Sequence, residues 1–245
     1  MKNLSKTGSK INSSVGRAIH DYDLIKEGDR ILVAVSGGKD SLTLLTLLKK
    51  IQTWAPVKFE LFAAHITTDF HCSSCSHRGT LTDFFDKAGV EHHFGHVNVL
   101  DEEGKTNCFW CSWNKRKALF EIADSLSCTK VALGHHKGDL AETMLLNLFF
   151  KGEISIMNPR QELFDGKITI IRPLCYVEEE QIIKFAKEER FPSKLCKCPF
   201  GRVSRRKYVK DLMKDIEKKN PGTNVKTNIL KSISRIKTDY IDLKD

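Results

Sequence analysis

The amino-acid sequence predicts an α/β fold in which a mostly parallel, twisted sheet carries helices on both faces. Short apolar, β-branched stretches alternate along the chain with longer stretches whose apolar residues recur at helical spacing. The chain has 245 residues, enough to bury the core of one large domain without disulfide bonds. No internal repeat is visible, so one sheet is expected to organise most of the chain.

The predicted strands and helices alternate as far as residue 191. Strands are expected at 30–36, 58–66, 91–99, 130–135 and 167–174, and helices at 39–51, 79–90, 112–126, 139–152 and 177–191. The stretch RILVAVS is short and β-branched, and KDSLTLLTLLKKI after it places Leu42, Leu45 and Leu48 on one helical face. The polar N-terminus is expected to fray, and the chain becomes basic and helical from Cys196. We therefore expect three parts: an N-terminal segment at 1–27, the main domain at 28–195 and a short helical extension at 196–245.

Composition limits the location and the partners of the protein. No run approaches 18 apolar residues, and MKNLSKTGSKINSS lacks the apolar core of a signal peptide, so a cytoplasmic protein without a membrane partner is expected. In a reducing compartment, eight cysteines indicate metal or sulfur chemistry rather than disulfide bonds. The net charge of +9 favours a polyanionic partner such as nucleic acid.

The sequence SGGKDS, from Ser36 to Ser41, is the strongest single motif. It lies between a predicted buried strand and a leucine-rich helix, where two glycines allow a tight turn and the helix N-terminus offers N–H groups to a phosphate. It matches neither the Walker A motif nor the dinucleotide-binding glycine motif. We call it the nucleotide loop. Its expected phosphate-binding residues are Ser36, Gly37, Gly38, Lys39 and Ser41, with Asp40 placed to hold Mg²⁺.

The nucleotide loop resembles the PP-loop of the ATP pyrophosphatase superfamily. Three blocks together are similar to the tRNA 2-thiocytidine synthetase family: DYDLIKEGDRILVAVSGGKDSLTLL, LGHHKGDLAETMLLNLFF and IIRPLCYVEEEQIIKFAKEERFP. This resemblance covers most of the chain. It implies a Rossmann-like fold of the adenine nucleotide alpha hydrolase type and ATP-dependent thiolation of tRNA, with cytidine converted to 2-thiocytidine. In that reaction the C2 oxygen of the base is adenylated and then replaced by sulfur.

The resemblance also implies roles for residues outside the nucleotide loop. Gly134 is expected near the adenosine, and Lys137 and Asp139 at the reacting centre, on a loop that faces the nucleotide loop. The family more often has two acidic residues after the basic one, and Gly138 stands at the first of those positions here. Main-chain contacts to adenine are expected from Ala64, His65 and Ile66. His135 and His136 are either structural residues at a strand end or catalytic.

Cys108 and Cys111 form a C-x₂-C pair that needs further ligands. One possibility is a zinc site completed by Cys72 and Cys75, although the gap between the pairs is longer than in zinc ribbons. The resemblance implies instead a 4Fe–4S cluster held by Cys108, Cys111 and a distant third cysteine, with one iron left open for sulfur. Cys198 is preferred for that third place, and Cys196 remains the alternative.

Basic residues flank both parts of the proposed cluster site. They are Lys115, Arg116 and Lys117 beside the cysteine pair, and Arg202, Arg205, Arg206, Lys207 and Lys210 after Cys198. A tRNA backbone could bind there, while Phe109, Trp110 and Trp113 either stack on a base or pack in the core. Further expected partners are a sulfur donor, either sulfide or a persulfide from a cysteine desulfurase, and by analogy a second copy in a homodimer. The alternatives are thiolation of another base of the 2-thiouridine type, desulfuration, or a zinc-stabilised RNA-binding module without catalysis.

Overall fold

The computed structural model describes residues 4–70, 77–192, 205–237 and 239. The chain divides into two compact units. The first comprises Met1–His136 and Asn158–Cys198, and the second comprises Lys137–Met157 and Pro199–Asp245. Each unit is described separately below.

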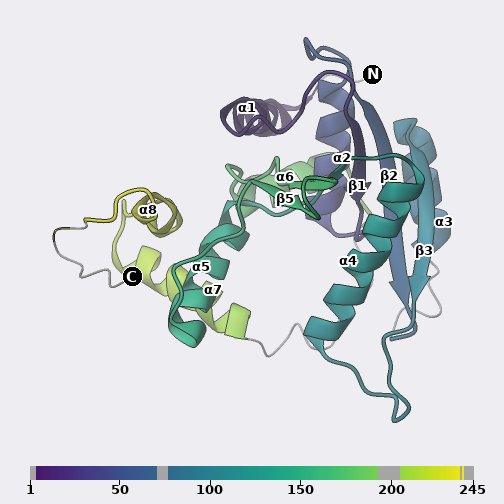
Figure 1. The fold of residues 1–245 in the computed structure, drawn as a ribbon. Coiled ribbons are helices and arrows are strands. Elements are labelled where there is room, and N and C mark those ends of the chain that lie inside the picture. The colour runs from purple at the N-terminus through teal and green to yellow at the C-terminus, as the bar shows by residue number, and fades with distance from the viewer. Residues whose placement is uncertain (1–3, 71–76, 193–204, 238, 240–245) are drawn as a thin grey trace. The chain divides into compact units, whose positions relative to one another are not determined.

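The first unit is built on one sheet with the strand order β3-β2-β1-β4-β6-β5 (Figure 1). The described strands are β1 (Arg30–Ala34), β2 (Glu60–Thr68), β3 (Glu91–Val97), β4 (Lys130–Ala132), β5 (Arg160–Leu163) and β6 (Ile168–Ile171). All neighbouring strands in this sheet are parallel except the edge pair of β5 and β6. The predicted α/β class with a mostly parallel sheet is confirmed.

Strand order reverses between β1 and β4, and this reversal positions the site. From β1 the chain moves outward through β2 to β3, then returns to place β4 on the other side of β1. Right-handed crossovers in opposite directions put their helices on opposite faces of the sheet. In parallel α/β sheets, ligands bind at the carboxyl ends of the strands beside such a switch point.

The helices of the first unit cover the sheet and each other. They are α1 (Lys6–Asp21), α2 (Lys39–Ile51), α3 (His77–Ala88), α4 (Cys108–Ser125) and α6 (Glu179–Glu188). Helix α4 packs on the sheet through Ala123 and its neighbours, against a core that includes Leu32, Phe62 and Val131. Helix α2 buries all of its leucines, Leu44 and Leu47 as well as those on the predicted face.

The N-terminal segment differs from the prediction, because it forms a helix rather than a frayed end. Helix α1 buries Ile11, Val15 and Ala18 on one face, and it is capped by the Ser5 side chain. Gly8 permits close packing on α6, since a Cβ there would lie 2.7 Å from the Phe185 ring. Most residues of MKNLSKTGSKINSS are polar, and the apolar face of the helix becomes apparent only when the residues are placed at helical spacing.

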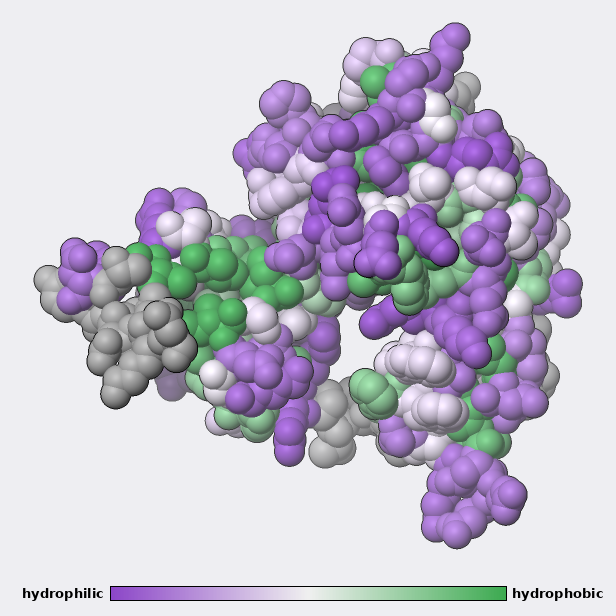
Figure 2. All heavy atoms as spheres, in the orientation of Figure 1, coloured by the Kyte–Doolittle hydropathy of each residue, from purple (hydrophilic) through white to green (hydrophobic). Residues whose placement is uncertain are grey.

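The second unit is a small helical assembly of α5 (Lys137–Lys151), α7 (Arg205–Lys219) and α8 (Val225–Ser232). Its core joins Ala141 of α5 to Val209 and Met213 of α7 and to Val225 of α8. Figure 2 shows apolar side chains gathered over these helices. The boundary of the units therefore differs from the predicted domain boundary, because α5 packs with the C-terminal helices. Over the part of the chain that is described, no helix is long and apolar enough to cross a membrane.

Candidate active site

The nucleotide loop connects the carboxyl end of β1 to the start of α2. Gly37 has φ of 83°, a conformation that favours glycine. Ser36 Oγ accepts a hydrogen bond from the Gly38 N–H at 3.3 Å and lies 3.2 Å from Ser41 Oγ. The N-cap residue of α2 is Gly38, which has no side chain to cap the helix. The N-terminal N–H groups of α2 are therefore presented to a ligand, as a phosphate site requires.

Gly134 follows β4 and lies directly against this loop. A Cβ at Gly134 would be 3.0 Å from both the Asp40 carbonyl carbon and the Ser41 nitrogen. Both contacts are to backbone, which cannot move aside as a flexible side chain can. Gly134, which the family resemblance predicts to lie near the adenosine, is thus required for the close approach of the segment after β4 to the nucleotide loop.

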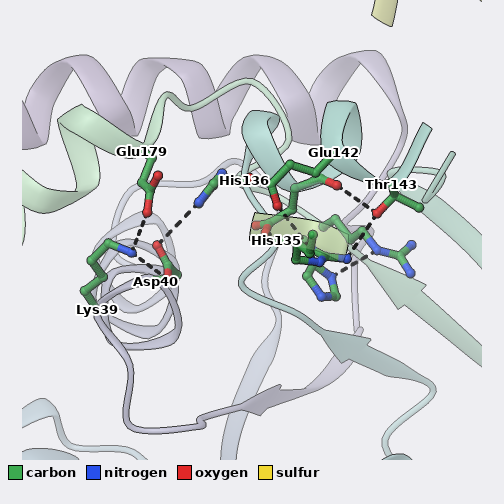
Figure 3. Close-up of polar contacts among 10 residues, drawn as sticks. Lys39, Asp40, His135, His136, Glu142, Thr143 and Glu179 are labelled. Carbon is green, nitrogen blue, oxygen red and sulfur yellow. Dashed lines mark hydrogen bonds and ion pairs between the residues drawn. The ribbon is translucent and has the colours of Figure 1, made fainter. Parts of the chain in front are cut away.

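Lys39 is held between two carboxylates. Its Nζ lies 3.1 Å from Asp40 Oδ2 and 3.1 Å from Glu179 Oε1 at the start of α6 (Figure 3). Burial acts to lower the pKa of Lys39, but the charges of Asp40 and Glu179 outweigh it, so the pKa is raised above 10.5. Lys39 therefore stays positively charged beside the loop.

Asp40 keeps one oxygen without a hydrogen bond. Among the described residues, no donor reaches its buried Oδ1. The Nε2 atom of the buried His136 imidazole lies 3.9 Å from this oxygen, a separation too long for a hydrogen bond (Figure 3). A buried carboxylate oxygen without a donor is costly unless a cation or a donor arrives with the ligand.

His135 belongs to a different network from His136. Arg172, buried at the carboxyl end of β6, donates from Nε to His135 Nδ1 at 3.3 Å. It also donates to the Asn158 carbonyl and, at 3.3 Å, to Gln161 Oε1. Burial lowers the pKa of Arg172 to about 10, and the nearby charge of Arg116 adds to this effect. Arg172 therefore ties the strand end that carries His135 to the chain before β5.

Ala64 pairs with Ala34, the last residue of β1, and His65 and Ile66 continue β2 past that end. Ala64 accepts a hydrogen bond from the Val35 N–H at 2.8 Å. Since backbone groups of alternate residues point to the same side of a strand, Ile66 directs its own N–H and C=O toward that side, beyond Ala34. The His65 side chain contacts the Val35 carbonyl at 2.7 Å, and its ring packs edge-on against Phe94. Ile66 therefore has the geometry expected for a main-chain contact to adenine.

Lys137 and Asp139 were predicted to lie on a loop, but they lie in the first turn of α5. Both belong to the second unit. Lys137 Nζ donates to Thr227 Oγ1 of α8 at 2.6 Å, and Asp139 pairs with Arg206 of α7 at 3.2 Å. The helix begins earlier than the apolar pattern indicates, because Lys137 and Gly138 already have helical backbone. These contacts join the family's candidate catalytic residues to the C-terminal helices.

Cys108 and Cys111 occupy the first turn of α4, which starts earlier than the predicted residue 112. Asn107 caps the helix by accepting a hydrogen bond from the Trp110 N–H at 2.8 Å. Cys108 is exposed and Cys111 is half-buried. A spacing of three residues puts the two thiols on neighbouring positions of one helix face. Cys72, Cys75, Cys196 and Cys198 lie outside the described residues, so the third ligand stays a prediction.

The first turns of α2 and α4 lie at the same edge of the sheet. Each helix follows a parallel strand, β1 or β3, and therefore begins at the carboxyl end of that strand. The nucleotide loop and the cysteine pair are thus both presented on the ligand-binding edge. By contrast, Cys128 and Cys175 are buried, and burial raises the pKa of these thiols to about 11 and about 12.

Comparison with known proteins decides the family. The PP-loop domain family matches residues 7–192. A tRNA-cytidine(32) 2-sulfurtransferase of Geobacter sulfurreducens is 41% identical over 240 residues, which cover 95% of this chain and 91% of the relative. The chain belongs to the tRNA-cytidine(32) 2-sulfurtransferase family. An enzyme of the same name from Delftia acidovorans is 41% identical over 89% of this chain and 71% of its own length.

Solved structures of other proteins share the fold of this chain. The U34-tRNA thiolase NcsA from Methanococcus maripaludis, solved with its 4Fe–4S cluster, matches with a TM-score of 0.77 at 21% identity. The match covers 98% of this chain and 81% of that one. NMN synthetase from Francisella tularensis matches with a TM-score of 0.51 at 13% identity, over 99% of each chain. At these identities the matches establish the fold of this sulfurtransferase family member and nothing further.

Glu179 is the residue of the site that sequence reasoning did not single out. It belongs to the third quoted block, but it stands among three consecutive glutamates that equally suit the acidic first turn of a helix. Only the packing of α6 beside α2 brings Glu179, rather than its neighbours, to the Lys39 ammonium. Its position as the third residue of the helix predicted at 177–191 was a signal that could have been used.

Proposed function

We propose that this chain thiolates tRNA, converting cytidine at position 32 to 2-thiocytidine at the expense of ATP. One observation carries the proposal. In a chain whose curated relatives bear that activity in their names, the nucleotide loop and a cysteine pair begin two helices at the same edge of one sheet. Either feature alone would suit many enzymes. Together they suit an enzyme that must activate a base with ATP and deliver sulfur to it.

The nucleotide loop binds the phosphates of ATP. The N–H groups at the start of α2 donate hydrogen bonds to the triphosphate, and the Ser36 and Ser41 hydroxyls add further donors. The Lys39 ammonium, now shared by Asp40 and Glu179, is a mobile charge that can turn to the phosphates. The Ile66 main chain and Gly134 define the adenosine side of the pocket.

The reaction needs an activated oxygen, because the C2 oxygen of cytidine is a poor leaving group. That oxygen attacks the α-phosphorus of ATP, the bond to the β-phosphate breaks, and pyrophosphate leaves. A sulfur nucleophile then attacks C2, the C2–O bond breaks, and AMP departs with the original oxygen. Loop donors stabilise the charge that develops on the phosphate, and Lys137 and Asp139 act at the reacting base.

Asp40 fits the role of a Mg²⁺ ligand. Its buried Oδ1, without a hydrogen-bond donor among the described residues, is the kind of oxygen that a hard cation prefers. When bound, Mg²⁺ neutralises part of the charge of the phosphates. Asp40 also helps to fix the resting position of Lys39 through its other oxygen.

Cys108 and Cys111 fit the role of iron ligands, with Cys198 as the third. They lie one turn apart at a helix N-terminus, where the helix dipole stabilises the negative charge of thiolates. A 4Fe–4S cluster with three protein ligands supplies an open iron that can carry sulfur. The sulfur itself comes from sulfide, or from the persulfide of a cysteine desulfurase once a two-electron reduction by a thiol has released its outer sulfur as sulfide. A homodimer and a cytoplasmic location complete the proposal.

Mass spectrometry of tRNA nucleosides tests this function. A strain that lacks the chain is expected to lose 2-thiocytidine and to keep every other thiolated nucleoside, and a plasmid copy is expected to restore it. Loss of a 2-thiouridine instead would assign the chain to another base. Unchanged nucleosides would contradict the proposal. Anaerobically purified protein is expected to be brown and to contain about four irons per chain, whereas a zinc-stabilised module would be colourless.

A further inference from the structure

The first two turns of α4 expose an unusual amount of aromatic surface. Phe109 is 77% exposed, Trp110 47% and Trp113 45%. Core packing, one of the two expectations for these side chains, is therefore excluded. Figure 2 shows pale and green side chains beside hydrophilic ones over this end of α4. Large exposed aromatic groups that lie close together mark a binding surface more often than an accident of packing.

The aromatic surface lies on the side of α4 that faces away from the sheet. Ala118, seven residues after Cys111, and Ile122, fourteen after Cys108, pack toward the core, so the cysteines begin the sheet-facing side of the helix. Trp110 and Trp113 continue instead the line of Lys117, Glu121 and Asp124, which are all exposed. The two tryptophans consequently lie on a different side of α4 from the cysteine pair.

The two tryptophans have the geometry of a stacking surface. Their ring centroids are 5.7 Å apart and their planes differ by 10°. Lys117 Nζ lies 6.0 Å from the centroid of the Trp113 ring. Lys117 Nζ also lies 3.9 Å from Glu121 Oε1, and the whole chain carries a net charge of +9. Flat aromatic faces beside a lysine match the bases and phosphates of unpaired RNA.

We propose that Trp110 and Trp113 form a platform on which unpaired nucleotides of the tRNA substrate stack, outside the pocket that holds the reacting base. The identity of the RNA rests on the proposed function, whereas the platform rests on the geometry of α4. An enzyme that acts on a loop nucleotide must hold the neighbouring bases once the loop is opened. The platform supplies that hold through sequence-tolerant stacking, and Lys117 contributes a phosphate contact.

Tryptophan fluorescence reports on the platform directly, because the chain has only three tryptophans. In a Trp54→Phe background, the signal comes from Trp110 and Trp113 alone. Titration with an anticodon stem-loop RNA is expected to quench this fluorescence in a saturable way, and a fully paired RNA duplex is expected to quench it much less. Absence of quenching while the RNA binds would overturn the proposal, since it would mean that another segment or a second copy covers the tryptophans.

Alanine variants measure how much the platform contributes. Trp110→Ala with Trp113→Ala is expected to weaken RNA binding by about 10-fold to 100-fold and to leave ATP binding unchanged. The matched control is Trp54→Ala, which removes a tryptophan of similar exposure, 53%, from a different part of the surface. Melting temperatures show whether each variant folds. Unchanged RNA affinity, an equal loss in the control, or conversion of a dimer to a monomer at unchanged RNA affinity would each overturn the proposal.

The outcome is separable from that of the proposed function. Thiolation without fluorescence quenching would refute the platform and leave the function standing. Quenching with normal RNA binding but no 2-thiocytidine would support the platform and refute the function. Cys108→Ser is a control for both assays, because it is expected to abolish thiolation and to retain the RNA-dependent quenching.

Discussion

Gly134 makes the most restrictive single-residue contact of the site. Gly134→Ala would force a methyl group against the backbone of Asp40 and Ser41, so the loop must shift. We expect a loss of stability of about 1–3 kcal/mol, typical of overpacking, and a loss of ATP affinity of about tenfold or more. Calorimetric titration with ATP and thermal melting measure the two effects.

Gly16→Ala is the control for this substitution. Among the described atoms, none lies within 4 Å of a Cβ at Gly16 in α1, so alanine is expected to keep ATP affinity and to raise stability slightly. If Gly134→Ala binds ATP as tightly as the unaltered chain, the close approach of β4 does not matter to the nucleotide site.

The ion pair of Lys39 with Glu179 predicts a pH-dependent stability. Since the pair raises the pKa of Lys39, its contribution is fully present below pH 10.5 and is lost as pH rises through the folded pKa. Glu179→Gln should therefore lower the melting temperature at pH 7–9, with the difference shrinking above pH 10.5.

Melting curves across this pH range check the Lys39 prediction. Glu102→Gln, which removes an exposed carboxylate from the turn before α4, is expected to have little effect at any pH. A difference between Glu179→Gln and the unaltered chain that persists undiminished at pH 11.5 would show that Glu179 stabilises the fold by packing rather than by charge.

Individual site residues differ in how well the sequence predicts them. Ser36–Ser41 and Gly134 could be placed because glycines and the ends of apolar strands mark sharp changes in the chain. Glu179 could not, because its partner Lys39 is 140 residues away and no local pattern distinguishes it from Glu178 or Glu180. Lys137 was assigned to a loop because the apolar spacing of α5 becomes visible only from Leu140.

The first turn of α4 depends on its N-cap. Asn107→Ala removes the hydrogen bond to the Trp110 N–H, which should cost about 1 kcal/mol and lower the melting temperature by about 2–4 °C. Because Cys108 and Cys111 lie in that turn, we also expect less iron to be retained after anaerobic reconstitution. Thermal melting and iron analysis give the two readouts.

Asn107→Asp restores a good capping residue and is expected to recover both stability and iron content. If Asn107→Ala loses stability but binds iron normally, the cap supports the helix without ordering the cysteine pair. If neither quantity changes, the first turn of α4 does not depend on the cap.

Helices and strands could be predicted where an apolar pattern is bounded by glycines. β1 and α2 follow the predicted boundaries closely because Gly28 precedes them and two glycines separate them. The sequence did not predict β5, because RQEL is short, polar and mostly exposed, and it pairs only at the edge of the sheet. It did not predict α1, because the apolar residues of that helix are few. Helix α4 begins before the predicted residue 112 because Asn107 caps it, and a polar cap residue does not extend an apolar pattern.

The positive charge of the whole molecule predicts strongly salt-dependent RNA binding. Release of counterions from about four phosphate contacts gives a slope of about −3.6 for log affinity against log salt, or a loss of roughly 100-fold between 50 and 200 mM salt. Filter binding with tRNA over this range measures the slope. A slope shallower than about −1 would contradict an electrostatic RNA interface.

Single charge removals locate that interface. Lys207→Gln, on the exposed basic start of α7, is expected to reduce the slope by about 1. Lys58→Gln removes another exposed charge, just before β2 at the amino edge of the sheet, and is expected to leave the slope unchanged. Equal effects of the two substitutions would indicate a diffuse attraction without a defined RNA path.

The joint action of the nucleotide loop and the α4 cysteine pair is tested most directly by thiolation in vitro. Iron-loaded protein, ATP, Mg²⁺, sulfide and unmodified tRNA are combined without oxygen, and the nucleosides are analysed by mass spectrometry. We expect one 2-thiocytidine per AMP released from the unaltered chain, and none from Cys108→Ala or Cys111→Ala variants that still bind ATP. Formation of 2-thiocytidine by either variant, or none by the iron-loaded unaltered chain, would contradict the account.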